Sequence, residues 1–189
     1  MALKHKGKIA LITGANKGIG FEVARQLGAE DITVLLGARN SHLGEIAGID
    51  AHFIEFDVTK PETITKAAEE IRVQHGRLDI LVNNAGVLVK GDGPPSVADP
   101  EAVRQALEVN FFGVLAVTQA MLPLVRSAPS GRIVMVSSGL GSLTWNADPR
   151  LAVCWLQVSG SQRIQGDSQY ADCAACMGVE GYYHQGQHR

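Results

Sequence analysis

Short apolar runs alternate with stretches of helical periodicity over the first 137 residues of this chain. The apolar runs predict five strands, at Lys8–Thr13, Thr33–Gly37, Ala51–Asp57, Asp79–Asn83 and Arg132–Ser137. Each run is short, and its apolar residues are mostly continuous rather than alternating with polar ones. That pattern is typical of parallel strands that are buried on both faces. We therefore expect one parallel sheet.

Apolar residues at helical spacing fill the segments between the predicted strands. They predict helices at Ile19–Leu27, Pro61–His75, Asp99–Leu107 and Asn110–Val125. Thr59 is the expected N-cap of the second helix, and Pro61 stands in its first turn. Alternating strands and helices predict an α/β fold with a doubly wound sheet and right-handed crossovers. Ligands of such sheets bind beyond the carboxyl ends of the strands.

A glycine-rich turn, Thr13-Gly-Ala-Asn-Lys-Gly-Ile-Gly20, joins the first predicted strand to the first predicted helix. Gly14 permits a tight turn, Gly18 lets backbone N–H groups approach a pyrophosphate, and Gly20 lets the helix and sheet pack closely. The phosphates would then sit at a helix N-terminus, where unpaired N–H groups and the helix dipole favour anions. The strand before this turn and the helical pattern after it raise the motif above a chance match.

Further polar residues follow the other predicted strands. Arg39 follows the second strand, and Asp57-Val58 closes the third. The sequence Asn83-Asn84-Ala85-Gly86 ends the fourth strand, and Ser137-Ser138 ends the fifth. Because these positions meet at one edge of a parallel sheet, they support a single site.

These motifs, in this order, resemble those of the short-chain dehydrogenase/reductase family over roughly the first three quarters of the chain. Asn16-Lys17 and the stretch Gly20–Leu27 resemble the carbonyl-reductase-type members. The resemblance implies an oxidoreductase with a Rossmann-type sheet, which transfers a hydride between nicotinamide and a small-molecule carbonyl substrate. It implies cofactor contacts by Gly14, Asn16, Lys17, Gly18, Ile19, Gly20, Arg39, Asp57, Val58, Asn84, Ala85 and Gly86.

The resemblance also assigns catalytic roles to two residues. Ser138 would hydrogen-bond the substrate carbonyl, and Asn110, in the helical stretch Val103 to Leu124, would hold a water of the proton relay. Each assignment has a structural alternative. Asn110 could be polar helix surface, Asp57 a turn carboxylate, and Asn84 to Gly86 a plain turn.

The choice of cofactor can be argued from charge. Ala38 stands where family members that prefer NAD(H) usually carry an acidic residue, while Arg39 follows it and Lys17 lies in the glycine turn. A 2′-phosphate needs positive partners and is repelled by a carboxylate. The pattern therefore favours NADP(H) over NAD(H). The alternative is that both cations are solvated surface charges.

The family's catalytic Y-x-x-x-K pair is absent from the sequence. A phenol with a pKa near 10 is a poor proton shuttle at neutral pH unless a cation stabilises its phenolate. Here the last lysine is Lys90, and the residue four positions after Tyr170 is Ala174. We expect carbonyl reduction to be impaired. The alternatives are a non-catalytic NADP-binding protein and an unstable truncated product.

The expected dinucleotide-binding domain is 1–145, and 146–189 is an irregular tail, so the doubly wound sheet is incomplete at its C-terminal edge. The segment Gln162 to His188 can be back-translated with free codon choice and then read with the frame shifted by one base. One of the resulting amino-acid sequences resembles the family's helix that carries the catalytic lysine. No codon for Ser161 restores the tyrosine. The tail is therefore family sequence in a shifted frame, the product of a mis-spliced exon or a pseudogene, or a real, divergent ending. Its pair Cys173 and Cys176 lacks a second ligand pair for a metal.

Composition adds few constraints. The chain is 46% hydrophobic and 19% charged, with a net charge of −2, which gives no reason to expect a nucleic-acid partner. No apolar run reaches the ~18 residues that span a membrane, and residues 1–6 lack the apolar core of a signal peptide, so a cytoplasmic location is expected. Family members often pair through two helices, of which only the one around Asn110 is recognisable here.

Overall fold

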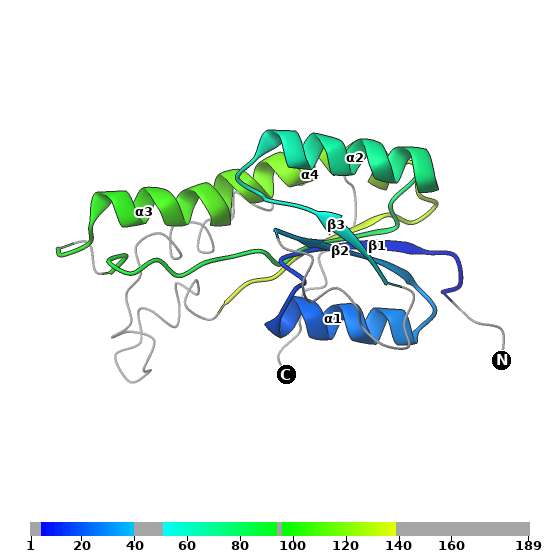
Figure 1. The fold of residues 1–189 in the computed structure, drawn as a ribbon, viewed down its shortest axis with the longest axis horizontal. Helices are drawn as coiled ribbons and strands as arrows, with labels where there is room; N and C mark the ends of the chain where they lie inside the picture. Colours follow the sequence, from blue (N-terminus) through cyan, green and yellow to red (C-terminus); the bar gives the residue numbers. More distant parts are fainter. Residues whose placement is uncertain (1–4, 40–50, 94–95, 139–189) are drawn as a thin grey trace, which may run out of the picture.

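The computed structural model describes residues 5–39, 51–93 and 96–138, and within them five strands form one parallel sheet (Figure 1). The order across the sheet is β3-β2-β1-β4-β5. The strands are β1 (Ile9–Thr13), β2 (Thr33–Ala38), β3 (Ala51–Glu55), β4 (Ile80–Asn83) and β5 (Arg132–Met135). The doubly wound α/β fold is therefore confirmed. The expected boundary near residue 145 and the tail lie outside the described residues.

Helices cover both faces of the sheet. Helix α1 (Gly18–Ala29) lies on one face, while α2 (Pro61–His75) and α4 (Val114–Arg126) lie side by side on the other (Figure 1). The central strand β1 is buried throughout and serves two cores. Leu11 belongs to the larger core under α2 and α4, and Ile12 belongs to the smaller core under α1.

The parallel register aligns the carboxyl ends of neighbouring strands. Thr13 pairs with Gly37 of β2, and Ile12 pairs with Val82 of β4. On the far side of β4, Asn83 pairs with Met135. The glycine turn after β1 and the segments that follow β2, β4 and β5 consequently leave the sheet at the same edge.

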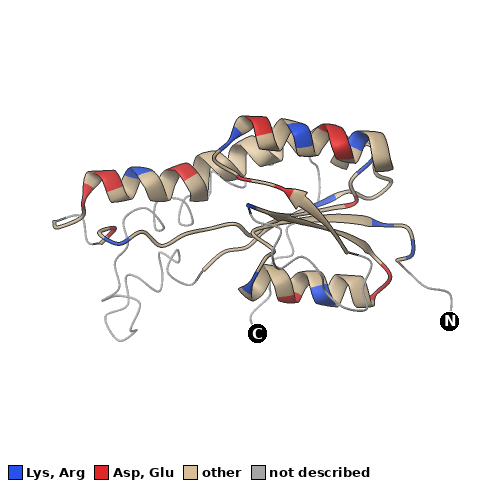
Figure 2. Ribbon diagram, viewed as in Figure 1, with Lys and Arg blue, Asp and Glu red and all other residues tan. Residues whose placement is uncertain are grey.

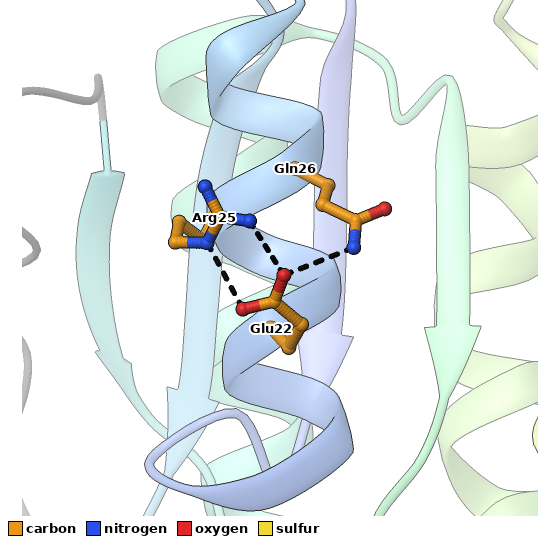
Figure 3. A network of polar contacts seen from close by, with 3 residues as sticks. All are labelled: Glu22, Arg25 and Gln26. Atoms are coloured by element: carbon orange, nitrogen blue, oxygen red, sulfur yellow. Dashed lines mark hydrogen bonds and ion pairs between the residues drawn. The ribbon is translucent and has the colours of Figure 1, made fainter.

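Charged residues lie mainly on helices and loops, and few are on the strands (Figure 2). On the exposed side of α1, the Arg25 guanidinium donates two hydrogen bonds to Glu22, at 2.9 and 2.6 Å, and the Gln26 amide donates a third (Figure 3). The bonds from Arg25, and then the one from Gln26, lower the pKa of Glu22 to about 2. This network occupies the solvated side of α1, while Ala24 faces the core.

Two strand predictions need correction. The third strand ends at Glu55, so Asp57 lies in the turn that follows it rather than closing the strand. The fifth strand is not buried on both faces. β5 forms one edge of the described sheet and has β4 as its only described strand neighbour. Of its residues only Ile133 packs against the core, whereas Val134 and Met135 are exposed.

The two helices predicted over 99–125 form one continuous helix. α3 (Pro100–Leu107) runs through a π-helical turn, η2 (Glu108–Gly113), directly into α4. The combined helix, Pro100–Arg126, is long and apolar enough to cross a membrane by length and composition. Apolar residues of this helix are buried within the protein, however, because Val117 and Met121 pack in the core beneath α4.

Candidate functional site

The glycine turn after β1 is fixed by its contacts with the segment after β4. Gly14 has a φ of +65°, which favours glycine, and a Cβ there would stand 2.9 Å from the Cα of Ala85. A Cβ on Gly20 would collide with the side-chain amide of Asn84 and would lie 2.9 Å from the carbonyl oxygen of Gly14. The two segments therefore approach each other at distances that only glycine allows.

Thr13 and Asn84 bind these two segments together. The buried Thr13 hydroxyl accepts hydrogen bonds from the backbone N–H groups of Asn84 and Ala85, both at 3.0 Å, and donates to the Val82 carbonyl at 3.4 Å. In return, the Asn84 amide donates to the carbonyls of Thr13, at 2.9 Å, and Gly14, at 3.3 Å. Asn84 and Ala85 thus lie against the glycine turn, as their sequence positions predict.

The N-terminus of α1 has no side-chain cap. Its N-cap residue is Lys17, whose side chain makes no capping hydrogen bond, and its first turn carries no acidic residue. In contrast, α3 is capped by Asp99, which accepts from the Glu101 N–H at 2.9 Å. Gly18 has a φ of +60°, and a Cβ there would have no atom within 4 Å. The dipole and N–H groups of this helix end are available to an anion.

The remaining residues of the turn surround that helix end. Lys17 and Ile19 are exposed, and Asn16 is half-buried. Together with Gly14, Gly18 and Gly20, they place the whole predicted turn at the carboxyl edge of the central strand.

Asp57, beyond the end of β3, lies within the electrostatic influence of Arg39, which follows β2. Partial burial raises the pKa of Asp57, but hydrogen bonds from the Thr59 hydroxyl and N–H, and then the charges of Arg39 and Lys60, outweigh it, so the pKa is lowered. The Thr59 hydroxyl and N–H donate to Oδ1 of Asp57 at 2.7 and 3.0 Å. The hydroxyl of Thr59 therefore does not cap α2, whose N-cap is Lys60, and that prediction was wrong.

Val58, next to Asp57, is buried and limits how closely the π turn can approach the turn after β3. A Cβ on Gly113 would lie 2.9 Å from a methyl carbon of Val58 and 3.0 Å from its carbonyl oxygen. The turn after β3 therefore packs directly against the start of α4. This contact ties the position of the π turn to the turn that holds Asp57.

Asn110 lies in the π turn and reaches the chain after β4. Its Oδ1 accepts from the N–H of Val87 at 2.8 Å, and its Nδ2 donates to the carbonyl of the same residue at 2.9 Å. The Gly86 position is also close, since a Cβ there would be 3.3 Å from the Asn110 Oδ1. The structure thus brings Asn110 to the Asn84–Gly86 segment.

Ser138 follows β5 at the same edge of the sheet. The Val136 N–H donates to the Asn83 carbonyl at 2.9 Å, which continues the β4–β5 pairing one residue beyond Met135. Ser138 is exposed and lies two residues further along. It therefore belongs to the same edge as Asn84 and Gly86.

Thr13 is the structural residue that the sequence reasoning missed. Its position at the head of the glycine motif was visible, but its three hydrogen bonds join residues about 70 positions apart, so no local pattern reveals them. Among the residues that the structure describes, no group of three or more His, Cys, Asp or Glu could hold a metal ion. Cys173 and Cys176 lie outside the described residues.

Comparisons with known proteins agree with this geometry. Residues 8–149 match the sequence model for short chain dehydrogenases. The chain is 36% identical over 163 residues to (+)-neomenthol dehydrogenase of Arabidopsis thaliana, covering 72% of this chain and 55% of that protein. It is 37% identical over 139 residues to carbonyl reductase (NADPH) 1 of Mus musculus, covering 69% of this chain and 48% of that protein.

Solved structures give the same result. A gluconate 5-dehydrogenase from Burkholderia cenocepacia, solved with NADP and tartrate, superposes with a TM-score of 0.76 at 26% identity, covering 92% of this chain and 67% of that one. The present chain spans about half the length of the two curated relatives above.

Proposed function

This chain belongs to the short-chain dehydrogenase family, and we propose that its site binds NADP(H). The observation that carries the proposal is the uncapped N-terminus of α1, where Gly18 leaves open space and Lys17 adds positive charge. A pyrophosphate fits such a helix end because N–H groups and dipole both favour an anion. Arg39, beyond β2, is the candidate partner of the 2′-phosphate.

The other site residues take roles that suit their positions. Asp57 and Val58 would hold the adenine end of the cofactor, and Asn84, Ala85 and Gly86 would line its nicotinamide end. Mus musculus carbonyl reductase (NADPH) 1 and the NADP complex of the Burkholderia cenocepacia dehydrogenase support the choice of NADP(H). When bound, this cofactor supplies a hydride to a carbonyl carbon or accepts one from an alcohol carbon.

Two residues would act on the substrate side. Ser138 would donate a hydrogen bond to the substrate carbonyl oxygen, which polarises the carbonyl for reduction. Asn110 holds the backbone of Val87 and thereby positions the segment that borders the nicotinamide. By resemblance, Asn110 would also hold a water that passes protons.

We propose that this 189-residue chain reduces carbonyls poorly, because it contains no Y-x-x-x-K. Without that pair, no group in the chain matches the family's proton donor to the product alkoxide. A non-catalytic NADP-binding protein is the second candidate function, and the retained Thr13–Asn84 network favours it. Sequencing the transcript across codons 145–189 distinguishes a shifted frame, which would continue into further family sequence, from a real, divergent tail.

Thermal melts with and without NADPH test the cofactor proposal, since a ligand that binds only the native state raises the midpoint. Gly18→Ala and Gly76→Ala form a matched pair, because both glycines have positive φ, +60° and +71°, and an added Cβ meets no atom within 4 Å at either. Both variants should melt at a lower temperature, because an alanine in this left-handed backbone conformation strains the folded state by about 1–2 kcal/mol.

Only Gly18→Ala should lose the shift that NADPH produces, because its methyl group would occupy the space proposed for the pyrophosphate. Loss of the shift in both variants, or in neither, would contradict this placement. An unliganded chain that melts cooperatively but is unchanged by NADPH would overturn cofactor binding altogether.

A further inference from the structure

Met135, the last residue of β5, is one of two methionines in the part of the chain that the structure describes. Met135 is 39% exposed, whereas Met121 of α4 is fully buried in the larger core. Met1 and Met177 lie outside the described residues. The two described methionines therefore differ in their access to solvent although they belong to the same folded unit.

The sulfur of Met135 carries a hydrogen bond from the interior of the protein. Asn83 and Met135 are paired in register across β4 and β5, and the Asn83 Nδ2 donates to the Met135 Sδ at 3.3 Å. Asn83 is buried, while Met135 lies on the edge strand of the described sheet. The donor consequently reaches the sulfur from the protein side, and solvent reaches Met135 from the other.

Thr118 of α4 determines which way the Asn83 amide faces. The single hydrogen of the Thr118 hydroxyl goes to the Val114 carbonyl at 2.7 Å, so this hydroxyl can only accept from Asn83. The Asn83 Nδ2 is the donor, at 3.1 Å. Turning the amide over would place its oxygen against the Thr118 and Met135 acceptors. Both amide hydrogens are therefore committed, one to Thr118 and one to the sulfur.

A thioether sulfur has two lone pairs, and addition of oxygen to one or the other gives two different sulfoxide epimers. In Met135 the Asn83 N–H engages the lone pair that faces the interior. The second lone pair is then the one available to an oxidant that arrives from solvent. Oxygen transfer to this side yields one epimer in excess.

We propose that Met135 is an oxidation site of the folded chain, and that Asn83 directs a peroxide to one sulfoxide epimer. One peroxide oxygen bonds to the sulfur as the O–O bond breaks. The sulfur loses two electrons, the proton of the transferred oxygen moves to the departing one, and hydrogen peroxide leaves as water. Because each epimer is reduced by its own enzyme class, one class of sulfoxide reductase should restore most of the methionine.

The oxidation site is separate in chemistry from the proposed cofactor site, although the two are close in the chain. Asn83 directly precedes Asn84, whose amide donates to the Thr13 carbonyl beside the glycine turn. The oxygen transfer requires neither NADPH nor a Y-x-x-x-K pair. The inference therefore goes beyond the proposed function and stands or falls independently of it.

Dilute hydrogen peroxide, followed by trypsin digestion and mass spectrometry, tests the proposal on the full chain. Trypsin cuts after Arg104, Arg126, Arg132 and Arg150, which leaves Met121 and Met135 on separate peptides with one methionine each. Met135 should oxidise at least about tenfold faster than Met121, which becomes accessible only when the core opens. Equal rates at the two residues would overturn the proposal.

The two stereospecific sulfoxide reductases, applied to the oxidised Met135 peptide, measure the epimers. The native chain should give one epimer in about threefold excess or more, because a hydrogen bond covers one lone pair. The same chain oxidised in concentrated urea is the control and should give nearly equal amounts, since Asn83 no longer contacts the sulfur. Nearly equal epimers from the native chain would show that Asn83 does not direct the oxygen.

Two variants test the role of the amide, and a thermal melt shows whether each is folded. Asn83→Leu removes the donor, so Met135 should oxidise faster and give nearly equal epimers. Thr118→Val removes the group that orients the amide and should also reduce the excess, while the matched change Thr65→Val on α2 should leave it unaltered. An undiminished excess in folded Asn83→Leu would overturn the proposal, and the comparison with urea decides it if neither variant folds.

Discussion

Asn110 forms a closed pair of hydrogen bonds with the backbone of Val87, in which its Oδ1 accepts from the N–H at 2.8 Å and its Nδ2 donates to the carbonyl at 2.9 Å. The side-chain amide of Asn110 thus pairs with the Val87 backbone as a neighbouring strand would. Because 23 residues separate the two, this contact joins the π turn to the chain after β4.

Asn110→Leu should lower the free energy of unfolding by about 1–2 kcal/mol, because two hydrogen bonds are lost while water can still reach the half-exposed backbone. Urea unfolding measures the loss. Gln119→Leu is the control, as it removes an exposed amide from the same continuous helix. Equal losses in the two variants would show that Asn110 does not hold Val87 in solution.

Thr13→Val should be more costly, with a loss of about 2–4 kcal/mol, because two partly buried N–H groups, those of Asn84 and Ala85, would lose their acceptor. Valine has nearly the shape of threonine, so the loss would report the hydroxyl rather than a cavity. Thr65→Val is the matched control: the exposed Thr65 hydroxyl bonds only to the Pro61 carbonyl of its own helix, at 2.9 Å. That variant should stay within about 0.5 kcal/mol of the parent.

Stability should fall in acid partly through Asp57. Its pKa is lowered in the folded chain, so its carboxylate stabilises the fold above the ordinary pKa of 3.8, and this contribution is lost as the pH falls through the lower, folded value. An NMR titration of the Asp57 carboxyl should therefore give a pKa below 3.8. Thr59→Val should move that pKa upward by removing the hydroxyl donor, and an unchanged pKa would rule out the Thr59 bond as a cause.

Arg39→Asp should reverse the cofactor preference. A carboxylate at this position would repel a 2′-phosphate and could accept hydrogen bonds from ribose hydroxyls. We expect NADPH affinity to fall at least about tenfold while NADH affinity holds or rises, measured by nucleotide fluorescence at fixed salt. Lys6→Asp makes the same change in net charge before β1, and a similar loss there would mean that Arg39 acts only through overall charge.

The sequence pattern correctly predicted those helices and turns whose ends are set by residues close to them in the chain. α2 runs from Pro61 to His75 as expected, because Pro61 suits the first turn and Gly76, with a φ of +71°, ends the helix in the left-handed conformation. The glycine turn was recognisable because its spacing follows from the backbone conformation of a tight turn. The N-cap of α2 was not, because Thr59 donates to Asp57 instead of capping the helix.

Contacts between distant segments were beyond the reach of the sequence pattern. The Thr13 hydroxyl bonds to residues after β4, and Asn110 to Val87, and neither pairing leaves a periodic signature. The exposure of β5 was also unpredictable, because Val134 and Met135 have the same apolar character as residues of a central strand.

The π turn changes the rotational phase of the long helix. Steps of about 3.6 residues from the buried Ala102 reach positions near 116 and 120, yet the fully buried residues are Val117 and Met121. The wider turn has therefore absorbed one residue and rotated everything after it by about 100°. Deleting one residue within Glu108–Gly113 would restore an ordinary α-helical turn and keep Val117 and Met121 facing the core, whereas a deletion that left the wide turn in place would move Thr118 and Leu122 into their positions. Correct alignment of this helix thus depends on a count of residues as much as on their identity.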